Sequence, residues 1–166
     1  YSAEPLPHFV DEYLAYLHEV QPTSATFDGI HLHDDLLEDL SRRAIDTQIR
    51  ELAAFERRLA AIDPARLTDT ERLERPAIEA NIRSRLFELE QVRTWERSPQ
   101  HYADIISTAR LQALFEYAPL EQRARRIVSK LRQVPRLIQA AKENIKDPAG
   151  IFVKVGLESM RGTQRF

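Results

Sequence analysis

The segment from Pro119 to Ile145 constrains the fold more than any other, because it predicts one long amphipathic helix. Its apolar residues recur at intervals of three and four and therefore share one helical face: Leu120, Ala124, Ile127, Leu131, Val134, Ile138, Ala141 and Ile145. Arginines occupy the opposite face, and we expect Ile127 and Leu131 to anchor the helix in a core. Pro135 lacks a backbone donor and crowds the preceding turn, so a kink or break is expected near Val134.

Prolines and capping residues divide the rest of the chain into further helices. They are predicted over Pro7 to Val20, from Ser41 to Asp63, from Thr68 to Ser98, from Pro99 to Tyr117, and over Ile151 to Met160. Ser41 is suited to cap the second helix, and Thr68 with Glu71 forms a capping box for the third. A mixed stretch covers Thr23 to Ser41, with Gly29 expected to end a helix and Asp34-Asp35 expected in a turn.

These elements predict an all-α fold, a proline-kinked bundle of about six helices in a single domain over residues 1–166. Apolar residues at helical spacing are the core candidates of the third and fourth helices: Leu73, Ile78, Ile82, Leu86, Leu89, Trp95, Tyr102, Ile105, Ala109 and Leu114. We interpret Trp95 and Tyr102 as residues of a core edge and not of a ligand box.

The last predicted helix is apolar on every side, with Ile151, Phe152, Val153, Val155, Leu157 and Met160 spread around its wheel. A helix of that kind is normally buried on every side. We therefore expect the chain to be the N-terminal portion of a longer helical protein, whose C-terminal part covers this segment. A homodimer through residues 151–166 is a further expectation, and an irregular segment folded over the bundle is the alternative.

Composition argues against some classes of partner and leaves the compartment open. The net charge is −2, and acidic residues interleave with the arginines, so no basic stripe favours a nucleic-acid partner. The chain has no cysteine, which excludes disulfides and thiolate metal ligands and fits bacterial cytoplasm and periplasm equally. No apolar run approaches the ~20 residues that span a bilayer, so no membrane association is predicted.

Histidines and carboxylates do not form a recognisable catalytic or metal-binding motif. His18-Glu19 begins a helical zinc motif, but Pro22 stands where the second histidine belongs. His31 and His33, followed by Asp34 and Asp35, are the densest group of possible ligands, and we interpret them as a solvated turn. We accordingly predict no catalytic, cofactor-binding or metal-ligating residue in this chain.

Three blocks of the sequence carry a resemblance to a known family. They are Pro22 to Gly29 with Asp39-Leu40-Ser41, Ser98 to Tyr102, and Lys130 to Ile138 running on to Ile145. In order and spacing they resemble the N-terminal part of the bacterial domain-of-unknown-function family 885. The resemblance implies a longer, largely helical parent whose later half is similar to gluzincin metallopeptidases, with zinc bound in that C-terminal half. No residue here matches the zinc motif.

Two functional hypotheses follow. By the resemblance, the chain is a non-catalytic helical domain of a zinc metallopeptidase-like hydrolase, forming one wall or lid of the substrate cleft. The alternative is a helical protein–protein interaction module without enzymatic activity, which docks a partner through its apolar last helix.

Overall fold

The computed structural model describes residues 4–111, 114–146 and 148–164, and this part of the chain forms eight α-helices and no strand. The helices are α1 (Leu6–Val20), α2 (Pro22–Phe27), α3 (Arg42–Ala61), α4 (Asp69–Phe87), α5 (Thr94–Arg97), α6 (Pro99–Leu111), α7 (Leu120–Asn144) and α8 (Gly150–Gln164). A 3-10 turn covers Pro64–Arg66 and a π-helical turn covers Glu88–Val92. The predicted all-α class is confirmed, and the helices beyond the expected six are the short α2 and α5.

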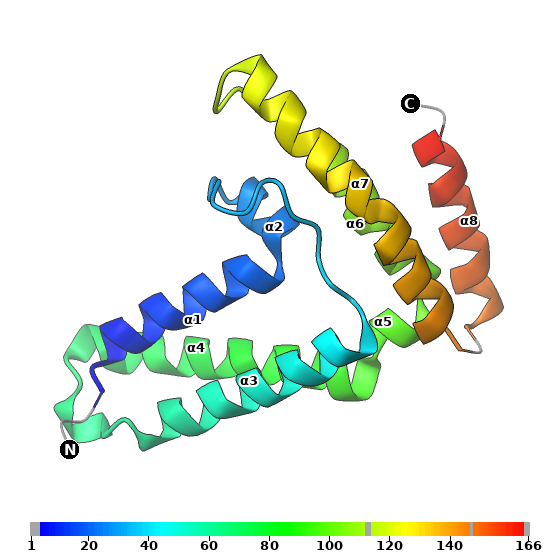
Figure 1. Cartoon of the computed structure of the whole chain (residues 1–166). Helices are drawn as coiled ribbons and strands as arrows, with labels where there is room; N and C mark the ends of the chain where they lie inside the picture. The colour runs from blue at the N-terminus through cyan, green and yellow to red at the C-terminus, as the bar shows by residue number, and fades with distance from the viewer. Residues whose placement is uncertain (1–3, 112–113, 147, 165–166) are drawn as a thin grey trace.

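The helices form two groups that meet near the start of α3 (Figure 1). In the first group α1, α3 and α4 enclose a core of aliphatic and aromatic side chains: Leu6, Phe9, Tyr13, Leu52, Phe55, Leu59, Ile62, Leu67 and Ile82. In the second group α5, α6 and α7 meet the beginning of α3 and the loop before it, around Leu37, Leu40, Ile45, Trp95, Tyr102, Ala109, Leu137 and Ala141. The loop from residue 30 to 41 therefore connects the two groups.

The two predicted side-chain caps, at Ser41 and at Thr68, are both confirmed. The Ser41 hydroxyl accepts from the Ala44 amide at 3.3 Å and caps α3. At α4 the Thr68 hydroxyl accepts from the Glu71 amide at 3.3 Å, while the Glu71 carboxylate accepts from the Thr68 amide at 2.7 Å. These contacts supply partners to backbone groups that have none within the helix. Gly29 has a φ of 82°, as expected for a residue that ends a helix.

The third predicted helix is shorter than expected, because it stops before Trp95. After α4 the chain makes the π-helical turn, and Arg93 then takes a left-handed φ of 56°, which is uncommon for a residue with a side chain. Trp95 is nevertheless buried, and its indole N–H donates to the Leu89 carbonyl at 3.0 Å. The prediction that Leu73 and Leu114 are core residues is wrong, since these side chains are 82% and 74% exposed.

The fourth predicted helix also ends early. Its end was expected at Tyr117, whereas α6 ends at Leu111. Tyr102 and Ala109 are buried as predicted, and the Tyr102 hydroxyl donates to the Trp95 carbonyl at 2.5 Å. The interpretation of Trp95 and Tyr102 as core residues is therefore confirmed.

The long helix α7 continues through Pro135 without a break, but its buried face overlaps the predicted one only in part, at Ala141 and at the partly buried Val134 and Ile145. Leu137 is 1% exposed, whereas Leu131, the expected anchor, is 45% exposed. Leu120 and Ile138 are also exposed. The buried face carries Lys130 and Asn144 as well as Leu137, Ala140 and Ala141, because other elements supply hydrogen-bond partners to its two polar side chains.

The last predicted helix forms as α8 and lies along α6, so the alternative of an irregular segment is wrong. At their contact a Cβ atom added to Gly156 would lie 2.9 Å from the Pro99 Cβ, which shows how closely the two backbones approach. Away from this contact α8 exposes several apolar side chains to solvent: Ile151, Phe152, Val155 and Leu157. Among the described residues no helix is both long enough and apolar enough to cross a bilayer.

Candidate functional site

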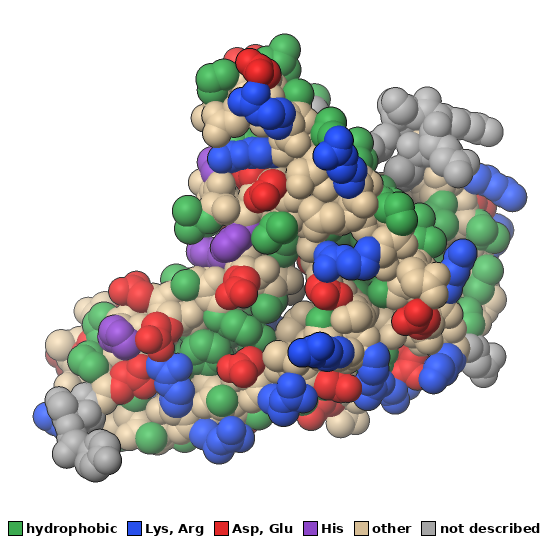
Figure 2. Space-filling view, in the orientation of Figure 1, with side chains coloured by type: hydrophobic (Ala, Val, Ile, Leu, Met, Phe, Trp, Pro, Cys, Tyr) green, Lys and Arg blue, Asp and Glu red, His purple; other side chains and the backbone are tan. Residues whose placement is uncertain are grey.

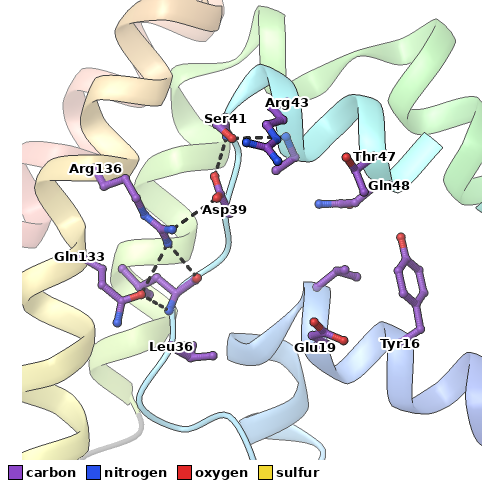
Figure 3. A pocket seen from close by; sticks show the side chains of 13 residues that line it. Tyr16, Glu19, Leu36, Asp39, Ser41, Arg43, Thr47, Gln48, Gln133 and Arg136 are labelled. Atoms are coloured by element: carbon purple, nitrogen blue, oxygen red, sulfur yellow. Dashed lines mark hydrogen bonds and ion pairs between the residues drawn. The ribbon is translucent and has the colours of Figure 1, made fainter. Parts of the chain in front are cut away.

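A pocket of about 470 Å³ opens where the two groups of helices meet. Its walls come from the end of α1, the start of α3, the middle of α7 and the loop that precedes α3 (Figure 3). Most of the residues that line it have polar or charged side chains: Tyr16, Glu19, Val20, Leu36, Leu37, Asp39, Ser41, Arg43, Ala44, Thr47, Gln48, Gln133 and Arg136. This volume is within the range of small-molecule sites.

Two side chains of α7 hold the loop wall of the pocket in place. The Gln133 amide accepts from the Leu37 N–H at 3.1 Å and donates to the Asp35 carbonyl at 2.7 Å. The Arg136 guanidinium donates to the Leu37 carbonyl and to the Asp39 carboxylate, each at 3.3 Å (Figure 3). The loop backbone thus has partners that fix its position relative to α7.

A buried polar cluster lies behind this wall and consists of Thr23, Thr26, Asp34, Glu38 and Lys130, all of them buried. The Glu38 carboxylate accepts from the Thr23 amide at 3.0 Å and from the Thr23 hydroxyl at 2.7 Å. The Thr26 hydroxyl donates to Asp34 at 2.7 Å, and Lys130 Nζ donates to Thr26 Oγ1 at 3.3 Å. The cluster joins α2, the loop and α7 through side chains.

Asp34 contradicts the interpretation of residues 31–35 as a solvated turn. The segment is a turn, but the Asp34 side chain is 0% exposed. Its carboxylate lies 3.0 Å from His31 Nδ1 and accepts from Arg126 Nη1 at 2.6 Å. The His31 ring stacks on Tyr117, with centroids 3.7 Å apart. The histidine is therefore engaged in packing and in a carboxylate contact within the protein.

Burial and hydrogen bonds oppose each other in this cluster. Burial alone would raise the pKa of Asp34, but hydrogen bonds from Tyr117, Thr26 and His31 outweigh it and hold the pKa below its usual value. Burial raises the pKa of Glu38 despite its bonds to Thr23. Burial lowers the pKa of Lys130, although the charges of Asp34 and Glu38 act in the other direction. The cluster is thus a set of interdependent charges inside the protein.

Some of the polar groups that line the pocket have partners within the protein, and others have none among the described residues. The Ser41 hydroxyl is occupied as the cap of α3, and no histidine lines the pocket. The lining therefore offers no imidazole as a general base for a hydroxyl nucleophile. Glu19, Arg43 and Gln48 have no hydrogen bond or ion pair with other described residues, which leaves their polar groups available to a ligand.

A group of possible metal ligands lies elsewhere, on α1 and just before it. Glu4, His8 and Glu12 bring one ligand atom each within 4.8 Å of one another. The Arg58 guanidinium pairs with both carboxylates of this group, so these carboxylates already share a cation from the protein. A zinc site of the gluzincin kind does not fit the residues of this chain, because Pro22 follows His18-Glu19 where the second histidine would stand.

The comparisons with known proteins agree with the sequence blocks. A family model of bacterial proteins of unknown function, DUF885, matches residues 22–165, and the chain therefore belongs to this family. A comparison with curated proteins finds no match. A solved structure described as "a putative lipoprotein of unknown function from Shewanella oneidensis" superposes with a TM-score of 0.86 at 21% identity. That match covers 96% of this chain and 29% of the other, and at this identity it shows a shared fold.

Proposed function

We propose that this chain is a non-catalytic helical part of a longer hydrolase-like protein and forms one wall or lid of its substrate cleft. The observation that carries the proposal is the pair of coverages: nearly all of this chain corresponds to only 29% of its solved relative. The pocket supports a role in binding, because its lining offers polar side chains that have no partner among the described residues.

Zinc-dependent peptide hydrolysis is the reaction that we propose for the longer protein. It rests on the resemblance of the family to gluzincin metallopeptidases, which is an argument from fold and motif order. The zinc would be held by residues beyond those of this chain, since none here fits the zinc motif. The exposed apolar side of α8, with Phe152 and Val155, would be covered by that later part of the polypeptide.

Metal content and peptide hydrolysis test the proposal directly. The 166-residue chain and the protein at its full natural length are purified without chelator and analysed for zinc, then assayed with a mixture of quenched fluorescent peptides. We expect zinc and chelator-sensitive hydrolysis in the full-length protein and neither in the 166-residue chain. Stoichiometric zinc in the 166-residue chain, lost on His31→Ala with His33→Ala, would contradict the proposal, as would an inactive, zinc-free full-length protein.

A second candidate function, an interaction module, is favoured by the apolar side of α8 alone. Ile151, Phe152, Val155 and Leu157 are exposed apolar side chains on one helix, and apolar residues gathered on a surface are typical of protein interfaces. Light scattering over a concentration series measures whether the 166-residue chain self-associates through it. Phe152→Asp with Val155→Asp should abolish association. Leu32→Asp, at an exposed leucine in the loop before α3, should not. A monomer at every concentration would remove the homodimer.

A further inference from the structure

The pocket lies between helix ends of opposite polarity. The carboxyl end of α1 contributes Glu19 and Val20, the last two residues of that helix. The amino end of α3 contributes Arg43 and Ala44, within its first turn. A helix carries partial negative charge at its carboxyl end and partial positive charge at its amino end. One side of the pocket therefore favours a cation and the other favours an anion.

Side chains strengthen this polarity. Glu19 adds a carboxylate at the negative end, and Arg43 adds a guanidinium at the positive end; Figure 3 shows them on opposite sides of the pocket. Neither makes an ion pair with any residue in the described ranges. Arg136 and Asp39, in contrast, already pair with each other and leave no net charge at the loop wall. Opposite charges that are available to a ligand thus remain on the two helix ends.

Neutral hydrogen-bonding groups complete the pocket between these charges. The Tyr16 hydroxyl is buried and has no hydrogen-bond partner within the described part of the chain. A buried polar group without a partner indicates a bound water or ligand. Burial, followed by the charge of Glu51, raises the pKa of Tyr16 to about 12, so its hydroxyl remains a donor at neutral pH. The Gln48 amide offers both a donor and an acceptor beside it.

We propose that this pocket binds a small zwitterion, an amino acid or a short peptide, with its ammonium group at Glu19 and its carboxylate at Arg43. Tyr16 and Gln48 then contact the polar groups between the two charged ends. The side chains of Val20 and Leu36 offer apolar contact to the side chain of the ligand. The inference rests on the proposed function only in the choice of a peptide as the probe; the polarity of the pocket comes from its own residues.

Calorimetric titration of the protein at its full natural length tests this binding. The probes are alanyl-leucine, its N-acetyl derivative, its C-terminal amide and free alanine. Each blocked dipeptide should bind about tenfold more weakly than alanyl-leucine, because each loses one charge-assisted contact. Glu19→Gln should weaken binding of the free dipeptide but not of the acetylated one, and Arg43→Gln should weaken binding of the free dipeptide but not of the amide.

Matched variants separate these effects from changes in stability. Arg57→Gln removes an exposed arginine of the same helix outside the pocket, and Glu74→Gln removes an exposed glutamate of α4; both should bind alanyl-leucine like the wild type. Binding of free alanine as tightly as the dipeptide would support the site and identify an amino acid as its ligand. Absence of binding by the folded protein, or binding insensitive to Glu19→Gln and Arg43→Gln, would overturn the proposal. Peptide hydrolysis is measured separately, so its absence bears only on the proposed reaction.

Discussion

Lys130 Nζ donates to the Thr26 hydroxyl at 3.3 Å, although 104 residues separate the two in the sequence. This contact joins α7 to α2 inside the protein, where both side chains are buried. The loop that forms a wall of the pocket lies between them and contributes Asp34 and Glu38 to the same cluster. The position of the wall therefore depends on charges that lie behind it.

Lys130→Met should destabilise the fold, because it removes the cation whose charge acts on the buried Glu38 carboxylate and leaves Asp34 with Arg126 as its cationic partner. Removal of one partner from a buried charged group typically costs about 3–5 kcal/mol. Glu38→Gln keeps an acceptor for Thr23 and removes a charge. The double variant Lys130→Met with Glu38→Gln should therefore lose less free energy of unfolding than the sum of the two single losses. Denaturant unfolding measures the three free energies, and Lys142→Met, at an exposed lysine of α7, is the control. Strict additivity would contradict this coupling.

Asp34→Asn should reduce stability in a pH-dependent way. The folded-state pKa of Asp34 is lowered below the unfolded value of about 3.9, so its charged form stabilises the fold above that pH. This contribution is lost as the pH falls through the folded-state pKa. The variant should be less stable by about 1.5–3 kcal/mol near neutral pH, and the difference should shrink in acid.

The urea unfolding midpoints of Asp34→Asn and the wild type, at neutral pH and at about pH 3, measure this difference. Asp11→Asn, at an exposed carboxylate of α1, is the matched control and should change little at either pH. A gap between Asp34→Asn and wild type that stays constant over the whole pH range would show that the charge of Asp34 is not what stabilises the turn.

Leu137→Ala should cost about 2–5 kcal/mol, the range for a buried leucine, whereas Leu131→Ala should cost well under this range. The two leucines lie on the same helix, and Leu137 is buried while Leu131 is 45% exposed. Thermal or denaturant unfolding of both variants measures the difference. If Leu131→Ala were the more damaging change, the buried face of α7 would be the one that hydrophobic spacing predicts.

Thr68→Ala should cost about 1 kcal/mol, because it removes the side-chain acceptor of the capping box at α4. Thr70→Ala, two residues into the same helix and equally exposed, keeps the box and should have little effect. Melting temperatures of the two variants suffice for the comparison. Equal melting temperatures would mean that the box contributes nothing measurable to the start of α4.

Local sequence signals predicted the helices well where a cap or a proline marks an end. Ser41, Thr68 and Pro119 all stand at the helix starts they predicted, because a cap acts through backbone groups one to three residues away. Such local signals do not predict the left-handed conformation of Arg93, which ends the helix before Trp95. Arginine is not a residue that favours this conformation, so no sequence signal was available.

The buried polar cluster could not be predicted in the same way. Lys130 and Asn144 are polar residues on α7, and hydrophobic spacing assigns them to the exposed side. They are buried because Thr26 and Leu40, more than a hundred residues earlier, supply their partners. For the pocket, the sequence pattern gave no sign that Glu19 and Arg43 would face each other, since that depends on how α1 and α3 diverge from their common core.

The surface of the molecule carries charges of both signs over α1 and α3, with apolar side chains between them (Figure 2). The mixed charge agrees with the net charge of −2 and forms no continuous basic patch on the face shown. The exposed side chains of α8, in contrast, are apolar, and we propose that the later part of a longer polypeptide covers them.

Carbene footprinting of α8 tests that claim most directly. The 166-residue chain and the protein at its full natural length are labelled side by side, and labelling is quantified at Phe152, Val155 and Leu157, with exposed Leu73 on α4 as the reference. We predict that the three α8 residues react readily in the 166-residue chain and are protected severalfold in the full-length protein, while Leu73 serves to normalise the two samples. Equal labelling of α8 in both proteins would contradict the account.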